Sequence, residues 1–280
     1  AIKEDEILAH IVSDSICMSS YKASIQGKKH KRVPDNVAEN PIIIGHEFCG
    51  EIVEVGEKWK GQFKAGEKFA IQPALNYKGS LDAPGYSYQY IGGDATYIVI
   101  PNEVMEMGCL LPFSGEGYFY GSLAEPMSCI VGAFKANYHT ERTSYEHHMG
   151  ICEGGSCALL ASAGPMGLGA VDLAVHGDRK PSLLVVTDID DARLNRAASI
   201  ITPEEAEKNG VKLIYLNTRD MTPQQVMELN GGQGFDDVFV FAPVAPVVEF
   251  GDAILGADGC MNFFAGPTDP AFSAKFNFYN

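Results

Sequence analysis

Three kinds of metal-binding side chain stand out in this 280-residue sequence. His46 and Glu47 follow an apolar run directly and precede a second strand-like run that is bounded by glycines. Cys17 lies upstream of them, and Glu125 lies downstream in a Leu-Ala-Glu-Pro segment. Imidazole, carboxylate and thiolate groups are all zinc ligands, and the first two do not belong in an apolar setting without a partner. Together these residues form a candidate catalytic zinc set.

Each of these residues also has an ordinary structural explanation. His46 and Glu47 are compatible with a capped turn that carries a core histidine and a surface glutamate. Cys17 is compatible with a small buried apolar residue, which free cysteine often is. His147 and His148 with Cys152 are a weaker combination, because adjacent histidines point in different directions, and we expect them to be solvated.

A second candidate site follows the apolar run 157–161, where residues 162–167 read Ser-Ala-Gly-Pro-Met-Gly. This segment departs from the pattern GxGxxG because Ser162 occupies the first glycine position. It nevertheless follows a strand-like run, opens a helical stretch and precedes an acidic residue, Asp188, at the end of the next apolar run. Gly164 would let the backbone approach a pyrophosphate, and Gly167 would let the helix pack on the sheet. A tight turn that binds no ligand is the alternative.

Two different patterns of apolar residues indicate the elements that position these sites. Between residues 42 and 101, glycines and prolines separate short β-branched runs, which is typical of an antiparallel β domain. From residue 157 onward, apolar runs alternate with helical stretches, which predicts a doubly wound parallel sheet. Residues 23–41 are polar and aperiodic, so we expect a loop there. The expected strands are 7–12, 52–55, 68–72, 96–100, 157–161, 182–188, 212–216, 237–241 and 260–264, and the expected helices are 166–176, 222–229 and 247–255.

The order of these motifs resembles the zinc-dependent medium-chain dehydrogenases, whose sorbitol-dehydrogenase branch uses a cysteine, a Gly-His-Glu turn and a glutamate in a Glu-Pro motif. Residues 92–97 are similar to that family's GGxAxY strand, and residues 163–168 to its cofactor turn. Within the family, segments 120–126 and 164–167 are most similar to sorbose-1-phosphate reductases. The resemblance covers nearly the whole chain. It implies an α/β protein with a β-rich GroES-like catalytic domain and a Rossmann domain.

The resemblance also assigns roles to the candidate residues. It implies one catalytic zinc held by Cys17, His46 and either Glu125 or Glu47, with Glu47 exchanging with water or orienting the site. Ser19 matches the hydroxyl that passes the alcohol proton onward. No second, structural zinc is expected, because residues 72–89 contain no cysteine. The residues implied to bind the nucleotide are Gly164, Pro165, Met166, Gly167, Asp188 and Arg193.

Proton chemistry explains why a zinc ion is expected. Hydride leaves carbon readily only after the attached oxygen has become an alkoxide, and alcohols do not ionise at neutral pH. Zinc brings the pKa of a bound water from about 15.7 to about 7, and a similar shift for an alcohol is worth on the order of 12 kcal/mol. For the cofactor, Asp188 should bind the ribose hydroxyls and repel a 2′-phosphate, which favours NAD(H). Arg193 lies at a basic position of the family and could partly relieve the exclusion of NADP(H).

Composition limits the classes of partner. The chain has 36 acidic and 21 basic residues and a formal net charge of -15, which disfavours nucleic acid. It contains no apolar stretch of the roughly 20 residues that a membrane span needs, and its first residues are not a signal peptide. The seven cysteines form no short-spaced pairs, so we expect reduced thiols. We therefore expect a cytoplasmic protein that binds neither membranes nor nucleic acid.

The expected domains are a zinc-containing catalytic domain at 1–130, a Rossmann domain at 131–275 and the start of a return to the catalytic domain at 276–280. Family members carry additional strands before this start and return after the nucleotide-binding domain, so we expect a fragment that lacks both ends.

The predicted function is interconversion of a polyol, or of a sugar phosphate, with its ketone, and L-sorbose 1-phosphate reduction is the leading case. The alternative is a non-catalytic nucleotide-binding descendant of the same fold. We expect a homo-oligomer, either a dimer or a tetramer. Four cations in five residues, Lys28, Lys29, Lys31 and Arg32, could bind the substrate phosphate, or could belong to a solvated loop.

Overall fold

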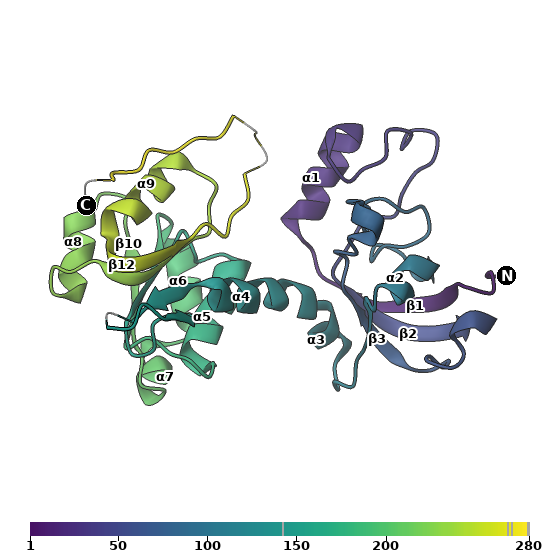
Figure 1. The fold of residues 1–280 in the computed structure, drawn as a ribbon, viewed down its shortest axis with the longest axis horizontal. Coiled ribbons are helices and arrows are strands. Elements are labelled where there is room, and N and C mark those ends of the chain that lie inside the picture. The colour runs from purple at the N-terminus through teal and green to yellow at the C-terminus, as the bar shows by residue number, and fades with distance from the viewer. Residues whose placement is uncertain (142, 268, 270, 279–280) are drawn as a thin grey trace. The chain divides into compact units, whose positions relative to one another are not determined.

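The computed structural model describes residues 1–141, 143–267, 269 and 271–278. It divides into two compact units, residues 1–126 and 127–280, which are described separately here (Figure 1). The predicted return to the catalytic domain at 276–280 includes residues 279 and 280, which lie outside the described residues.

Unit 1 is built on an antiparallel five-stranded sheet in the order β4-β1-β2-β3-β5. Side chains alternate along β1, where Ile7, Ala9 and Ile11 are buried and contribute to the main core of the unit. Gly50 on β2 is required, because a Cβ there would lie 2.0 Å from the carbonyl oxygen of His10 on β1. The strands are β1 (Ile7–Asp14), β2 (Phe48–Val55), β3 (Lys68–Ile71), β4 (Tyr97–Ile100) and β5 (Leu110–Pro112).

A helix that the sequence pattern did not predict follows β1 directly. Helix α1 spans Met18–Gln26, with Cys17 as its N-cap residue, and it ends at Gly27, whose φ of 52° lies in the left-handed region. A short 3₁₀ helix, Gly27–Lys29, comes next. The predicted loop at 23–41 is therefore wrong over its first residues. The other helical segments of unit 1 are η2 (Glu57–Trp59), η3 (Tyr77–Gly79), α2 (Asn102–Glu106) and α3 (Tyr118–Ser122), and α4 (Ala124–Ala136) leads into unit 2.

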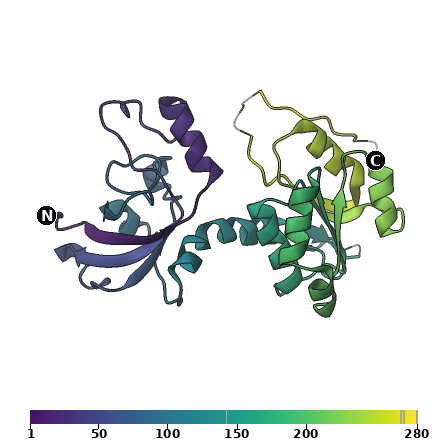
Figure 2. The same cartoon turned by 180° about the vertical axis from the view of Figure 1, so that it is seen from behind.

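Unit 2 contains a parallel five-stranded sheet in the order β10-β9-β8-β11-β12. On β8, Cys157 and Leu159 belong to the core on one face, whereas Ala158 and Leu160 belong to the core on the other. Burial on both faces explains why the strands read as continuous apolar runs. Helices cover both faces, as the views from front and back show (Figures 1 and 2). The strands are β8 (Ser156–Leu160), β9 (Leu183–Asp188), β10 (Lys212–Asn217), β11 (Phe235–Val240) and β12 (Leu255–Asn262).

The remaining elements complete the crossover connections of unit 2. A two-stranded sheet pairs β6 (Tyr138–Thr140) with β7 (His147–Met149). The helices are α5 (Pro165–His176), α6 (Asp191–Ile200), α7 (Pro203–Lys208), α8 (Pro223–Met227), η4 (Glu228–Asn230) and α9 (Ala245–Ile254).

The two sheets confirm the predicted fold class, an antiparallel β unit followed by a doubly wound parallel sheet. The strand order of unit 2 reverses between β8 and β11, which creates a topological switch point at the carboxyl end of β8. One strand was misplaced in the prediction, since β12 spans Leu255–Asn262 rather than 260–264. Within the described residues, no helix has the length and apolar character needed to cross a membrane.

Candidate functional site

The structure brings three of the predicted metal ligands together in unit 1. One ligand atom each from Cys17, His46 and Glu47 lies within 4.8 Å of the others. His46 and Glu47 are both buried, each with 5% of its surface exposed, and they immediately precede β2. Cys17 stands between β1 and α1 and brings its thiol to the same group. Residues that lie 29 positions apart in the sequence thus form one cluster.

Backbone hydrogen bonds hold the turn that carries His46 and Glu47. The carbonyl of Glu47 accepts from the N–H of Ser15 at 3.0 Å, and the carbonyl of Gly45 accepts from the N–H of Gly93 at 2.8 Å. Gly45 has a φ of 91°, which strongly favours glycine, and a Cβ there would lie 2.9 Å from the backbone nitrogen of Asp94. The end of β1 and the segment before β4 therefore fix the turn from two sides.

Ser20 orients the imidazole of His46. The Ser20 hydroxyl on α1 lies 3.1 Å from Nδ1 of His46. Nε2 of the same ring lies 3.6 Å from Oε1 of Glu47. With Nδ1 bonded to Ser20, Nε2 is the nitrogen directed toward Glu47, where a bound metal would compete with the hydroxyl of Tyr86 at 3.2 Å. The hydroxyl of Ser15 donates to the second oxygen of Glu47 and positions that carboxylate.

The electrostatics of the cluster suit a bound cation. Burial lowers the pKa of His46, which keeps the imidazole in its neutral, metal-binding form. Burial raises the pKa of the Cys17 thiol, and the carboxylate of Glu47 acts in the same direction. A divalent cation reverses the penalty on the thiolate, because it supplies the positive charge that this buried site lacks. One sulfur, one nitrogen and one oxygen donor fit zinc.

Glu125, the other predicted ligand, is not a member of this three-residue group. It lies in the first turn of α4, within unit 1. Its charge still contributes to raising the pKa of Tyr86, although burial and then the charge of Cys17 contribute more. The choice between Glu47 and Glu125 as the third ligand therefore stays a prediction.

Tyr86 is a residue of this site that the sequence did not reveal. Its hydroxyl lies 3.2 Å from Nε2 of His46, and its ring centroid lies 4.7 Å from that of His46. Tyr86 is buried, and burial raises the pKa of its hydroxyl, whereas the neighbouring Ser19 side chain acts in the opposite direction. Ser19, the predicted proton-transfer residue, also directs its backbone N–H at the sulfur of Cys17 at 3.4 Å. The only sequence signal for Tyr86 was an aromatic residue after Pro84 and Gly85.

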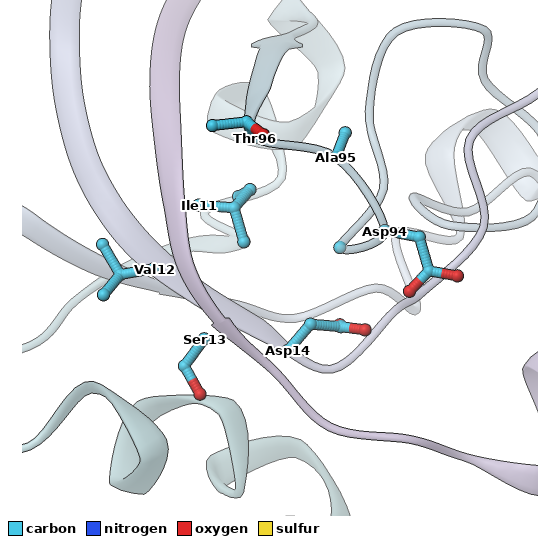
Figure 3. Close-up of a pocket in the computed structure, with 8 residues that line it drawn as sticks. Ile11, Val12, Ser13, Asp14, Asp94, Ala95 and Thr96 are labelled. Atoms are coloured by element: carbon cyan, nitrogen blue, oxygen red, sulfur yellow. The ribbon is translucent and has the colours of Figure 1, made fainter.

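An open cavity of about 350 Å³ lies against the same end of β1 (Figure 3). Asp14 and Asp94 both line it, and Asp14 also lies against the turn, because a Cβ placed on Gly45 would be 3.0 Å from its Oδ2. Burial, and then hydrogen bonding and charge from Asp94, raise the pKa of Asp14 to about 7. Asp14 thus couples the cavity wall to the turn that carries the metal ligands. The lining residues are Ile11, Val12, Ser13, Asp14, Gly93, Asp94, Ala95 and Thr96.

The predicted nucleotide turn lies at the switch point of the sheet in unit 2. Gly164 is the N-cap residue of α5, and no side chain caps the helix end. Around a Cβ placed on Gly164 there is nothing within 4 Å, whereas a Cβ on Gly167 would lie 1.8 Å from the carbonyl oxygen of Ser162. The free space, and the uncapped N–H groups of Met166 and its neighbours, fit a pyrophosphate. Pro165 occupies the first helical turn, where its missing N–H costs nothing.

Ser162 replaces a glycine without blocking the turn because its side chain points away from it. The residue is fully buried, and its hydroxyl donates to the carbonyl oxygen of Leu159 at 2.7 Å. Its backbone N–H donates to the carbonyl oxygen of Thr187 at 2.8 Å, which ties β8 to β9. The side chain of Ser162 therefore stabilises the end of β8 and does not contact the space proposed for the ligand.

Asp188 stands at the end of β9, as predicted, and is buried. One carboxylate oxygen accepts the backbone N–H groups of Ile189 and Asp190 at 2.8 and 3.2 Å. Arg193 is directed to Asp190, with Nε 3.9 Å from its carboxylate. A second cation that the sequence analysis did not include, Arg219, donates to the carbonyl oxygen of Ile189 at 2.8 Å.

Known proteins match the chain both over most of unit 1 and over its full length. Residues 3–108 match the model of the alcohol dehydrogenase GroES-like domain. The chain is 55% identical over 282 residues to mannitol-1-phosphate 5-dehydrogenase of Aliivibrio fischeri, covering 100% of this chain and 66% of the relative. It is 50% identical over 280 residues to L-sorbose 1-phosphate reductase of Klebsiella pneumoniae, covering 100% of this chain and 67% of that protein.

These identities decide the family. The chain belongs to the zinc-dependent medium-chain alcohol dehydrogenases. Among solved members of the fold, galactitol-1-phosphate dehydrogenase from Escherichia coli superposes with a TM-score of 0.70 at 21% identity, covering 100% of this chain and 73% of that one. A Sinorhizobium meliloti structure described as a zinc-binding dehydrogenase bound to NADP gives a TM-score of 0.75 at 19% identity, with 100% and 74% covered. The chain spans about two thirds of the length of its curated relatives.

Proposed function

We propose that this chain is part of a zinc-dependent, NAD(P)-linked oxidoreductase that interconverts a secondary alcohol of a polyol or sugar phosphate with its ketone. The observation that carries the proposal is the convergence of half-buried Cys17 with buried His46 and Glu47, with Ser20 fixing the orientation of the imidazole. The names of two relatives that are at least 50% identical support the substrate class, since one is named for a hexitol phosphate and the other for a ketohexose phosphate.

The residues proposed to hold one zinc are Cys17 and His46, with Glu47 or Glu125 as the third ligand. When bound, zinc stabilises negative charge on the substrate oxygen. Glu47 either binds the ion in exchange with water or orients the site. Ser19 is proposed to carry the alcohol proton away from the reacting oxygen, and its backbone N–H lies 3.4 Å from the sulfur of Cys17, which places it beside the metal ligands.

The nucleotide is proposed to bind at Gly164, Pro165, Met166 and Gly167, with its pyrophosphate at the N-terminus of α5. Asp188 favours NAD(H), because a fixed carboxylate there would repel a 2′-phosphate. Arg193 works in the opposite direction and leaves NADP(H) as the second cofactor, although its partner in the structure is Asp190.

L-Sorbose 1-phosphate remains our leading substrate, and mannitol 1-phosphate is the second candidate because the relative of that name is 55% identical. The two differ in a testable way, since sorbose 1-phosphate carries its phosphate next to the carbonyl carbon, whereas the mannitol enzyme is named for reaction at carbon 5. We also propose a cytoplasmic homo-oligomer.

The experiment that tests this function uses zinc-replete protein with NADH or NADPH and follows nucleotide oxidation during addition of L-sorbose 1-phosphate, or of the ketohexose phosphate derived from mannitol 1-phosphate. Turnover of one phosphorylated ketose, faster with NADH than with NADPH, is expected. The alternative, a non-catalytic nucleotide-binding descendant, predicts NADH binding without turnover of any of these compounds.

A further inference from the structure

Three cations of unit 1 lie close enough to His30 to lower its pKa, and one of them, Arg32, also acts on His46. Lys22 lies on α1, and Lys31 and Arg32 lie in the segment that follows η1. Throughout the part of the chain that the structure describes, no ion pair joins these three side chains to an acidic residue. In a protein of net charge -15, unpaired neighbouring cations are unexpected unless an anion binds there.

Arg32 is fixed in place, unlike a solvated loop residue. Its backbone N–H donates to Nδ1 of His30 at 3.3 Å, and its carbonyl accepts from the hydroxyl of Ser87 at 2.7 Å. Its guanidinium carbon lies 5.4 Å from the ring centroid of Tyr86. Its Nε is buried and has no hydrogen-bond partner within the described residues. A buried, charged donor without a partner is costly, so this atom is suited to a ligand that supplies an acceptor.

His30 adds a neutral donor to the same group. Its ring stacks on Tyr86 at 5.6 Å with an interplanar angle of 6°. Burial, and then the charges of Arg32, Lys31 and Lys22, hold the pKa of His30 below its ordinary value. Because Nδ1 accepts the N–H of Arg32, the hydrogen of the neutral ring is carried by Nε2. His30 therefore presents an N–H beside three cations.

Tyr86 connects this group to the metal cluster. One ring serves both sites, since Tyr86 contacts Arg32 and His30 through its ring and His46 through its hydroxyl at 3.2 Å. A molecule whose reacting oxygen lies at the metal cluster beside His46 could therefore place a second group near Arg32, still within unit 1.

We propose that Arg32, Lys22, Lys31 and His30 form the subsite for the phosphate group of a phosphorylated polyol or ketose. The inference rests on the proposed function for its substrate, because the metal cluster is where the reacting carbon would be bound. A guanidinium matches phosphate oxygens in pairs, and two ammonium groups balance the remaining charge. Lys28 and Lys29 in η1 are not part of this subsite, because their charges are not among those that lower the pKa of His30.

The test compares Arg32→Gln with Lys29→Gln in the zinc-loaded chain. Two quantities are measured: KM for a ketohexose phosphate and for the same ketohexose without phosphate, and the shift in Tm that inorganic phosphate causes. Arg32→Gln is expected to raise KM for the phosphorylated ketose by about tenfold or more, because a charged hydrogen bond is lost, and to abolish the phosphate-induced shift in Tm. KM for the free ketose should not change. Lys29→Gln is expected to behave like the wild type in both measurements.

The outcomes separate this inference from the proposed function. If Arg32→Gln raises both KM values equally, or leaves the phosphate-induced shift in Tm intact, the subsite is overturned while the proposed function stands. If the wild-type protein turns over no ketose but inorganic phosphate stabilises it through Arg32, the proposed function fails and the subsite stands. Loss of phosphate stabilisation in Lys29→Gln and not in Arg32→Gln would move the subsite to η1 and contradict the inference.

Discussion

The metal cluster of unit 1 is made of side chains, whereas the nucleotide turn of unit 2 is made of backbone. The cluster brings together a sulfur, a nitrogen and an oxygen from the side chains of Cys17, His46 and Glu47. The turn instead needs an uncapped helix end and the absence of a Cβ at Gly164 and Gly167. The first site should therefore be sensitive to the identity of its donors, and the second to added volume.

Cys17→Ala should have the largest effect, because it removes the one sulfur donor. Metal catalysis contributes several kcal/mol to the barrier, so we expect kcat to fall by more than about a thousandfold. The nucleotide turn is formed in unit 2, so NADH affinity, measured by fluorescence titration, should stay close to that of the wild type. A variant that retained zinc and turnover would show that the thiol is an ordinary buried group.

Ser19 and Ser20 are neighbours on α1 that should fail in different ways. Ser20→Ala removes the hydrogen bond to Nδ1 of His46 and should weaken zinc binding by about 10- to 100-fold, measured by competition with a chelator. Ser19→Ala should leave zinc affinity nearly unchanged and lower kcat by about a hundredfold, because it removes a proton-transfer group. Equal effects of the two substitutions on zinc affinity would contradict the separate roles.

Gly167→Ala and Gly164→Ala test, in the same paired way, whether the two glycines of the turn have different roles. A Cβ at residue 167 would lie 1.8 Å from the carbonyl oxygen of Ser162, so we expect unit 2 to lose about 1–3 kcal/mol of unfolding free energy. A Cβ at residue 164 meets nothing within 4 Å, so Gly164→Ala should keep its stability and lose NADH affinity. Thermal unfolding followed by circular dichroism measures the stability of both variants, and fluorescence titration measures their NADH affinity. The fluorescence of Trp59, the one tryptophan, reports on unit 1.

Unchanged NADH binding in Gly164→Ala would show that no pyrophosphate approaches this turn. A loss of stability in Gly164→Ala equal to that in Gly167→Ala would show instead that the backbone packs more closely there than its free space indicates.

Asp14 should give the smallest effect, a pH dependence of unit 1. Its pKa of about 7, compared with an ordinary 3.8, means that the folded chain binds a proton that the unfolded chain has released. This contribution to stability is fully present below about pH 4 and is lost as the pH rises to about 7. Asp14→Asn cannot ionise and should make the unfolding free energy of unit 1 less dependent on pH in that window. The measurement uses chelator-treated protein and Trp59 fluorescence at pH 5 and pH 8.

An identical pH slope in the wild type and in Asp14→Asn would show that Asp14 is ionised in the folded protein. It would also show that Asp94 does not raise the pKa of Asp14.

The sequence predicted the parts of the molecule whose signals are local. The fold class followed from apolar runs that are buried on one or both faces of a sheet. Helix α1 was missed because its buried residues, Ser20 and Ala23, are small and give no apolar pattern, whereas its large apolar side chains are exposed. Strand β12 was misplaced because glycines at 256 and 259 weaken its apolar pattern.

The candidate site was predictable only as far as its ligand types. His46 and Glu47 are adjacent, and the family resemblance selected Cys17, but nothing local marks Tyr86, which reaches His46 from 40 residues away. The subdivision of the basic segment into a pinned Arg32 and exposed Lys28 and Lys29 depends on contacts with Ser87 and His30. These contacts depend on tertiary structure and leave no pattern in the sequence.

The most direct test of the metal cluster is the zinc content of the purified chain. After zinc-replete purification and removal of loosely bound ions, elemental analysis should give one zinc per chain in the wild type and none in Cys17→Ala. We expect one zinc because unit 1 contains one group of candidate ligands and residues 72–89 contain no cysteine. Two tightly held zincs per chain, or none in the wild type, would contradict the account.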